Sequence, residues 1–115
     1  MAVKCSVLTN PVYTNAALTG STAVQSIAFN LNAVSNPQCC WAIIAGAGLT
    51  ATFQVMVSQD NVTYIDSGLS LPSISGSAKN IWVEYDGGAP WALLQITPSS
   101  GTGSVVVKGS FKGNG

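Results

Sequence analysis

Residues 50–58 read Thr-Ala-Thr-Phe-Gln-Val-Met-Val-Ser. Successive side chains of a β-strand point to opposite faces. In this stretch one face would carry Ala51, Phe53, Val55 and Val57, and the other would carry Thr52, Gln54, Met56 and Ser58. Asp60-Asn61 follows at once, and such a polar pair is typical of the tight turn of a hairpin. The segment therefore predicts a strand that turns back into a second strand over residues 63–66.

The rest of the chain repeats this pattern, with β-branched and aromatic runs separated by Ser, Thr, Asn and Gly. Turn chemistry is strong at 86–90 (DGGAP) and at 98–103 (PSSGTG), and we predict that the second of these is a hairpin. The expected strands cover residues 3–8, 23–31, 39–45, 50–58, 63–66, 80–85, 91–97 and 103–111. About eight short strands predict an all-β, antiparallel, two-sheet sandwich. Both a jelly roll and an Ig-like Greek key fit that number.

The 115 residues fit a single domain, 1–115. Residues 9–22 carry turn chemistry with few apolar anchors, so they are predicted to be either a long surface loop or part of an arm, residues 1–22, that reaches a neighbouring subunit.

The chain is 47% hydrophobic, only 7% charged and formally neutral, whereas an average domain is about 25% charged. This balance argues against disorder. Four scattered lysines without arginine or histidine argue against direct nucleic-acid binding. No apolar run reaches the roughly 18 residues of a spanning helix, and we expect no signal peptide from residues 1–5, which lack a charged region followed by a long apolar stretch. We therefore expect neither a membrane nor a nucleic-acid partner, and a protein made in a reducing cytoplasm.

No constellation of catalytic side chains stands out. The absence of histidine excludes a Ser-His-acid relay and removes the usual partner of a cysteine nucleophile. Asp60, Asp66, Glu84 and Asp86 occur at a hairpin or at a strand end, where solvated turn acids are common. A calcium ion held by Asp60, Asn61 and Asp66 would match no EF-hand spacing. We expect no enzyme, cofactor or metal.

Three cysteines, Cys5, Cys39 and Cys40, do not suggest a disulfide framework, because their number is odd and two are adjacent. We interpret them as small buried side chains in a reducing compartment.

Apolar side chains exceed what one sandwich can cover. If Ile81, Val83 and Tyr85 pack inward, Trp82 points outward beside Glu84; residues 39–45 are apolar on both faces. The same reasoning places three further apolar side chains on outer faces: Met56, Trp91 and Leu93. Because exposed apolar patches and tryptophan are typical of contact surfaces, Met56, Trp82, Trp91 and Leu93 are the interface candidates, and a homo-oligomer is expected.

Two stretches, residues 50–66 and 90–107, resemble small virion proteins of bacteriophages: a strand ends in Ser-x-Asp-Asn, a Tyr and an Asp follow, and a hairpin closes the chain. Leu94 or Gln95 stands where that pattern often carries an arginine. The resemblance implies a β-sandwich of the virion that decorates or cements a capsid, commonly as a homotrimer, in contact with the major capsid protein or another virion protein. The alternative is a carbohydrate- or receptor-binding module on a phage tail or fibre, with Tyr13, Tyr64, Trp82 and Trp91 stacking on sugar rings.

Overall fold

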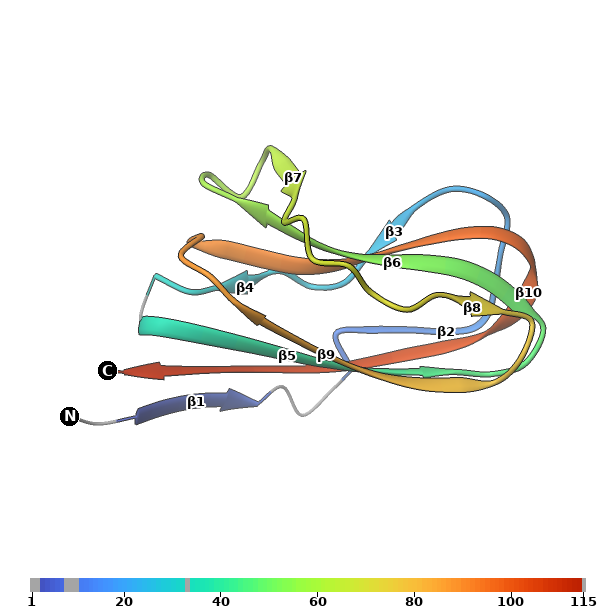
Figure 1. Cartoon of the computed structure of the whole chain (residues 1–115), viewed down its shortest axis with the longest axis horizontal. Coiled ribbons are helices and arrows are strands. Elements are labelled where there is room, and N and C mark those ends of the chain that lie inside the picture. The colour runs from blue at the N-terminus through green and yellow to red at the C-terminus, as the bar shows by residue number, and fades with distance from the viewer. Residues whose placement is uncertain (1–2, 8–10, 33, 115) are drawn as a thin grey trace.

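The computed structural model describes residues 3–7, 11–32 and 34–114. These residues form strands and no helix, so no helix among them could span a membrane. The strands are β1 (Val3–Val7), β2 (Tyr13–Thr19), β3 (Val24–Gln25), β4 (Phe29–Asn30), β5 (Ser35–Ala45), β6 (Leu49–Ser58), β7 (Tyr64–Asp66), β8 (Ile74–Ser75), β9 (Lys79–Asp86) and β10 (Trp91–Asn114). They form one connected, curled sheet in which every pairing is antiparallel (Figure 1). The all-β, antiparallel prediction is confirmed.

Strand β10 divides this sheet into two groups of strands. Its C-terminal half lies between β5 on one side and β1 and β2 on the other, and β9 pairs with β5 at the far edge. Its N-terminal half lies between β6 on one side and β3 and β4 on the other, with β7 and β8 beyond β6. We call these the β5–β9 group and the β6–β7 group.

The predicted hairpin at residues 98–103 is wrong, because the chain continues through this stretch as a single bent strand. The chain from β5 through β6, residues 35–58, pairs with β10 along both of its halves; we call it the β5–β6 segment. Near the middle, Gly101 lies opposite Leu49 and Val105 lies opposite Ala45. A register shift follows Pro98, so the ribbon bends at a bulge. The two halves of β10 pair with β5 and β6 and not with each other, and the turn residues carry one long strand round the end of the curled sheet (Figure 1).

Residues 11–22, the described part of the predicted loop at 9–22, also differ from the expectation of a loop, and residues 9 and 10 lie outside the described residues. Tyr13–Thr19 form β2, which pairs with Thr102–Val107 of β10. The segment has few apolar residues because it is an outer strand with one fully buried side chain, Leu18. That residues 1–22 reach a neighbouring copy stays a prediction.

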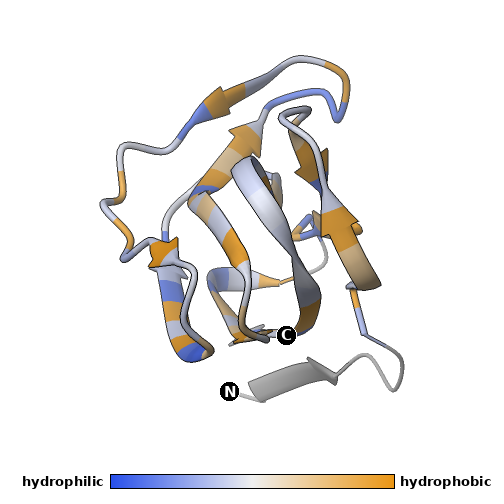
Figure 2. Cartoon of the chain, turned by 90° about the vertical axis from the view of Figure 1, so that its right-hand side faces the viewer, coloured by the Kyte–Doolittle hydropathy of each residue, from blue (hydrophilic) through white to orange (hydrophobic). Residues whose placement is uncertain are grey.

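One hydrophobic cluster lies inside the curl and takes side chains from both groups. Strand residues alternate between this cluster and the outside, as the hydropathy colours along the strands in Figure 2 indicate. At its centre Trp41 stacks on Phe29, with ring centroids 5.4 Å apart and ring planes 11° apart. The phase of alternation predicted for residues 50–58, 80–85 and 91–97 is confirmed by the buried Phe53, Val83 and Leu94.

Candidate functional site

Strand β9 holds Trp82 away from the core. Its neighbours Ile81 and Val83 are buried, whereas 64% of the Trp82 surface is exposed. The indole Nε1 donates a hydrogen bond of 3.0 Å to Glu84 Oε1. The single polar atom of the ring is therefore satisfied within the chain, and the apolar remainder is left to solvent.

Trp82 belongs to a wider apolar surface on the outer face of the β5–β9 group. Ala42 lies directly opposite Trp82 in the register, and Ile44, 41% exposed, is two residues further along β5. Val106 of β10 lies opposite Ile44, and Cys40 lies opposite Glu84. We call Cys40, Ala42, Ile44, Trp82 and Val106 the Trp82 face. Three neighbouring strands build it, so it is a contiguous apolar surface.

Among the described side chains, the charged ones nearest the Trp82 face lie at its margin. Lys108 lies opposite Ala42 on the side away from Trp82, and Glu84 follows Trp82 along β9. An apolar centre with a charged rim is the usual composition of a protein–protein contact.

The other three interface candidates lie on the outer side of the β6–β7 group. Met56 of β6 lies opposite Leu93 of β10. Two residues further along each strand, Ser58 lies opposite Trp91. Met56 and Trp91 are half-buried. Leu93, expected to be exposed, retains only 3% of its surface, so this expectation is wrong. Leu93 belongs to an inner strand whose outer face is covered by neighbours, and it offers little to a partner.

Sequence reasoning missed several exposed apolar side chains: Ile27, Ile44, Val62, Ile65 and Leu69. The signal for Ile44 was present, since residues 39–45 are apolar on both faces. Ile65 and Val62 lie at the β6–β7 hairpin, where a short strand gives too few alternations to show a phase.

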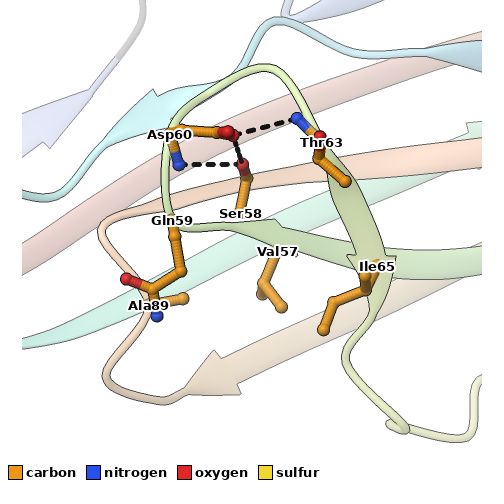
Figure 3. Close-up of a pocket in the computed structure, with 7 residues that line it drawn as sticks. All are labelled: Val57, Ser58, Gln59, Asp60, Thr63, Ile65 and Ala89. Atoms are coloured by element: carbon orange, nitrogen blue, oxygen red, sulfur yellow. Dashed lines mark hydrogen bonds between the residues drawn. The ribbon is translucent and has the colours of Figure 1, made fainter.

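A shallow hollow of about 260 Å³ lies between the β6–β7 hairpin and Ala89 of the β9–β10 connection (Figure 3). Asp60 is the one ionisable side chain among its lining residues. Its Oδ1 accepts hydrogen bonds of 2.9 Å from the backbone N–H groups of Thr63 and Val62 and one of 3.0 Å from the Ser58 hydroxyl. These bonds lower the pKa of Asp60, with Thr63 contributing most. The carboxylate holds the turn together and is not poised as an acid or base.

The cysteines of β5 are not activated nucleophiles. Burial raises the pKa of Cys39 to about 12, and burial followed by the nearby Glu84 raises the pKa of Cys40. The reactive form of cysteine is the thiolate, and both side chains are thiols at neutral pH. Both are free cysteines. The side chain of Cys5 lies outside the described residues.

The residues proposed for calcium are used within the turns. Asp66 accepts hydrogen bonds from the Gly68 N–H at 2.8 Å and from Gln54 Nε2 at 3.0 Å, while Asp60 binds the hairpin backbone. Among the described residues, no group of three or more His, Cys, Asp or Glu side chains could hold a metal ion.

The four aromatic residues considered for sugar stacking do not share one platform. Trp82 is on the edge of the β5–β9 group, while Trp91 and Tyr64 are in the β6–β7 group. Tyr13 packs against the core cluster. Trp82 is exposed, whereas the other three are half-buried.

No family model matches the chain, and the search of curated proteins found no match.

Proposed function

We propose that the chain is a structural virion protein that decorates or cements a bacteriophage capsid through homo-oligomeric and shell contacts. The Trp82 face carries this proposal. A free β-protein normally solvates one face of its sheet, and here Trp82 and Ile44 expose apolar surface across that face. Surface of this kind marks a contact site.

The same proposal includes the finer fold, an eight-stranded jelly roll. In a jelly roll the strands wrap so that the first pairs with the last, the second with the seventh, the third with the sixth and the fourth with the fifth. Here β2 would be the first strand, β3 with β4 the second, β5 the third, β6 the fourth, β7 with β8 the fifth, β9 the sixth, and the two halves of β10 the seventh and eighth. The observed pairs then match: β2 pairs with the C-terminal half of β10, β3 and β4 pair with its N-terminal half, β5 pairs with β9, and β6 pairs with β7 and β8. This order supports a jelly roll over an Ig-like Greek key, and jelly rolls are frequent in capsid proteins.

The proposed mechanism is linkage. A protein that binds the assembled shell but not its free subunits stabilises the assembled state, and the stabilisation grows with the logarithm of its free concentration relative to its Kd. Symmetric copies turn a modest contact into high avidity. An apolar contact suits this task because salt screens surface ion pairs but not apolar burial. The site of action is the virion, reached from the host cytoplasm during assembly, and no catalysis is required.

The alternative is a carbohydrate- or receptor-binding module on a tail or fibre. The observation that favours it is the exposed indole of Trp82 beside the Glu84 carboxylate, because aromatic faces next to polar groups bind sugar rings. The separation of the other aromatic residues weakens it, since a single ring gives a small platform.

Light scattering of the purified protein across protein and salt concentrations tests the proposal. We expect a stable homo-oligomer whose mass does not fall in high salt. The resemblance to phage proteins favours three copies. A monomer that binds glycans on an array would overturn the proposal and establish the alternative.

A further inference from the structure

Strand β9 ends the β5–β9 group with an open edge. Within the described residues its ladder partner is β5, and its backbone makes no hydrogen bond to any other segment. An edge strand presents a row of unpaired N–H and C=O groups to any strand that can align with it. The eight residues of β9 therefore offer a template for another strand.

The other edges are short or interrupted, and β9 is neither. The β6–β7 group ends in strands of two or three residues on both sides, and short edge strands resist pairing. The edge of the β5–β9 group opposite β9 is divided between β1 and β2, and a register shift interrupts the β2 pairing. By contrast, β9 pairs with β5 without a shift from Lys79 to Asp86 and contains neither proline nor glycine.

The geometry points to pairing of β9 with the β9 of a second copy, antiparallel about a two-fold axis through Trp82. Opposite residues of an antiparallel pair lie on the same face, so this register sets the two Trp82 rings side by side on the outer face. Asn80 then lies opposite Glu84 of the second copy, and Ile81 lies opposite Val83. The amide of Asn80 can donate to the Glu84 carboxylate, and no like charges face each other.

Neighbouring registers fit less well. Centring the axis on Glu84 sets two carboxylates opposite each other, which destabilises a sheet. Centring it on Val83 sets Trp82 opposite Glu84 and loses the pair of indoles, although aromatic cross-strand pairs stabilise sheets. An isologous contact of this kind closes with two copies.

This pairing rests on the proposed function, and for its homo-oligomeric contact it puts a two-fold dimer in place of the three copies that the resemblance favours. A two-fold axis normal to the sheet keeps each outer face on the same side. The two Trp82 faces would join into one apolar surface of twice the extent, spanning two copies and available to the shell.

The first test compares two lysine substitutions at equally exposed apolar positions. Trp82→Lys would set two ammonium groups opposite each other, whereas Ile65→Lys changes a side chain that is 63% exposed on β7. We expect light scattering to show a dimer for the wild type and for Ile65→Lys. For Trp82→Lys we expect dimer dissociation at protein concentrations at least about tenfold higher. Circular dichroism checks that both variants fold. A dimer unaffected by Trp82→Lys overturns this pairing.

The second test fixes the register by oxidation in a Cys5→Ser/Cys40→Ser background. Trp82→Cys sets its thiol opposite its own counterpart, and the double variant Asn80→Cys/Glu84→Cys brings the two positions together across the axis. Both should form disulfide-linked dimers. The single variant Asn80→Cys should not, because its counterpart is four residues, or roughly 13 Å, along the strand. Cross-linking of Asn80→Cys alone, or of none, overturns the register.

The oligomeric state of the wild type separates this inference from the proposed function. A trimer without the Trp82 cross-link overturns the β9 pairing and leaves the virion proposal in place. A monomer at all concentrations overturns both.

Discussion

Gly101 crosses Gly48 so closely that a Cβ on Gly101 would collide with the Gly48 carbonyl oxygen. Both residues have positive φ, 78° for Gly101 and 106° for Gly48. The Gly48 carbonyl also accepts a hydrogen bond of 3.1 Å from the Thr102 N–H. This crossing lies where β10 and the continuous run from β5 into β6 bend together round the end of the sheet (Figure 1).

We predict that Gly101→Ala destabilises the protein by about 3 kcal/mol or more, because it adds a steric collision with backbone to an unfavourable left-handed conformation. Chemical denaturation measures the change in the free energy of unfolding. Gly20→Ala is the matched control, since Gly20 has a φ of 94° and no atom near its Cβ position. It should cost only about 1 kcal/mol. Equal losses in the two variants would show that the crossing does not matter.

A second prediction concerns Ser26, which lies between the short strands β3 and β4. Its hydroxyl accepts a hydrogen bond of 2.9 Å from the Leu94 N–H, and its own N–H donates to the Leu94 carbonyl. Ser26 is buried. Ser26→Ala removes the hydroxyl oxygen that accepts from the Leu94 N–H, so this buried donor loses its partner. The change should lower the unfolding free energy by about 1–3 kcal/mol.

The control for Ser26 is Ser99→Ala, which removes an exposed hydroxyl that donates to the Thr50 carbonyl at 3.3 Å. Its effect should stay within about 0.5 kcal/mol. If Ser26→Ala is equally mild, water replaces the hydroxyl and the site is less enclosed than its burial indicates.

Much of this fold follows from the phase of side-chain alternation. Residues 50–58 predict β6 nearly to its ends, and residues 80–85 predict both the buried Val83 and the exposed Trp82. Alternation is a local property, because it depends only on which way successive side chains point. The centre of the Trp82 face could therefore be predicted from the sequence.

What the sequence did not predict depends on pairing between distant segments. Tyr13–Thr19 have weak strand character and become β2 because Val105–Val107 lie beside them. Residues 98–103 have turn chemistry, yet they continue as a strand because the β5–β6 segment runs alongside. The exposure of Leu93 likewise depends on which neighbours cover the outer face, and alternation contains no information about that cover.

The acid stability of the β6–β7 hairpin should depend on Asp60. Because its folded pKa lies below the ordinary value of 3.8, the ionised carboxylate stabilises the folded state above that pH. This stabilisation is lost as the pH falls below about 4 and through the folded pKa. Asp60→Asn keeps an acceptor oxygen but cannot titrate, so its melting temperature should fall less between pH 6 and pH 3 than that of the wild type. Parallel curves would contradict this role.

Gly109 provides a test of the packing at the centre of the core. It lies opposite Trp41 in the register, and a Cβ there would stand 2.6 Å from Phe29 Cζ and 3.2 Å from Trp41 Cδ1. Gly109→Ala should therefore force the stacked rings apart and lower the unfolding free energy by about 1–3 kcal/mol. Gly88→Ala, with no atom near its Cβ position, should be close to neutral. A neutral Gly109→Ala would mean that Phe29 can move aside freely.

The buried thiol of Cys39 should make the protein sensitive to alkali. Its pKa is raised from 9.0 to about 12 by burial and, to a smaller extent, by Cys40. Above pH 9 the unfolded thiol ionises while the native thiol does not, so stability falls as the pH rises from about 9 to about 12. At pH 10 this linkage removes about 1.4 kcal/mol of unfolding free energy.

Denaturant unfolding at pH 8 and pH 10 should show that Cys39→Ala loses less stability over this interval than the wild type, whatever its stability at pH 8. The half-buried Cys40 gives the control variant, Cys40→Ala, which should keep most of the alkaline loss. If Cys39→Ala and the wild type lose the same free energy over this interval, the native Cys39 thiol ionises as readily as the unfolded one, and β5 must open to solvent at that position.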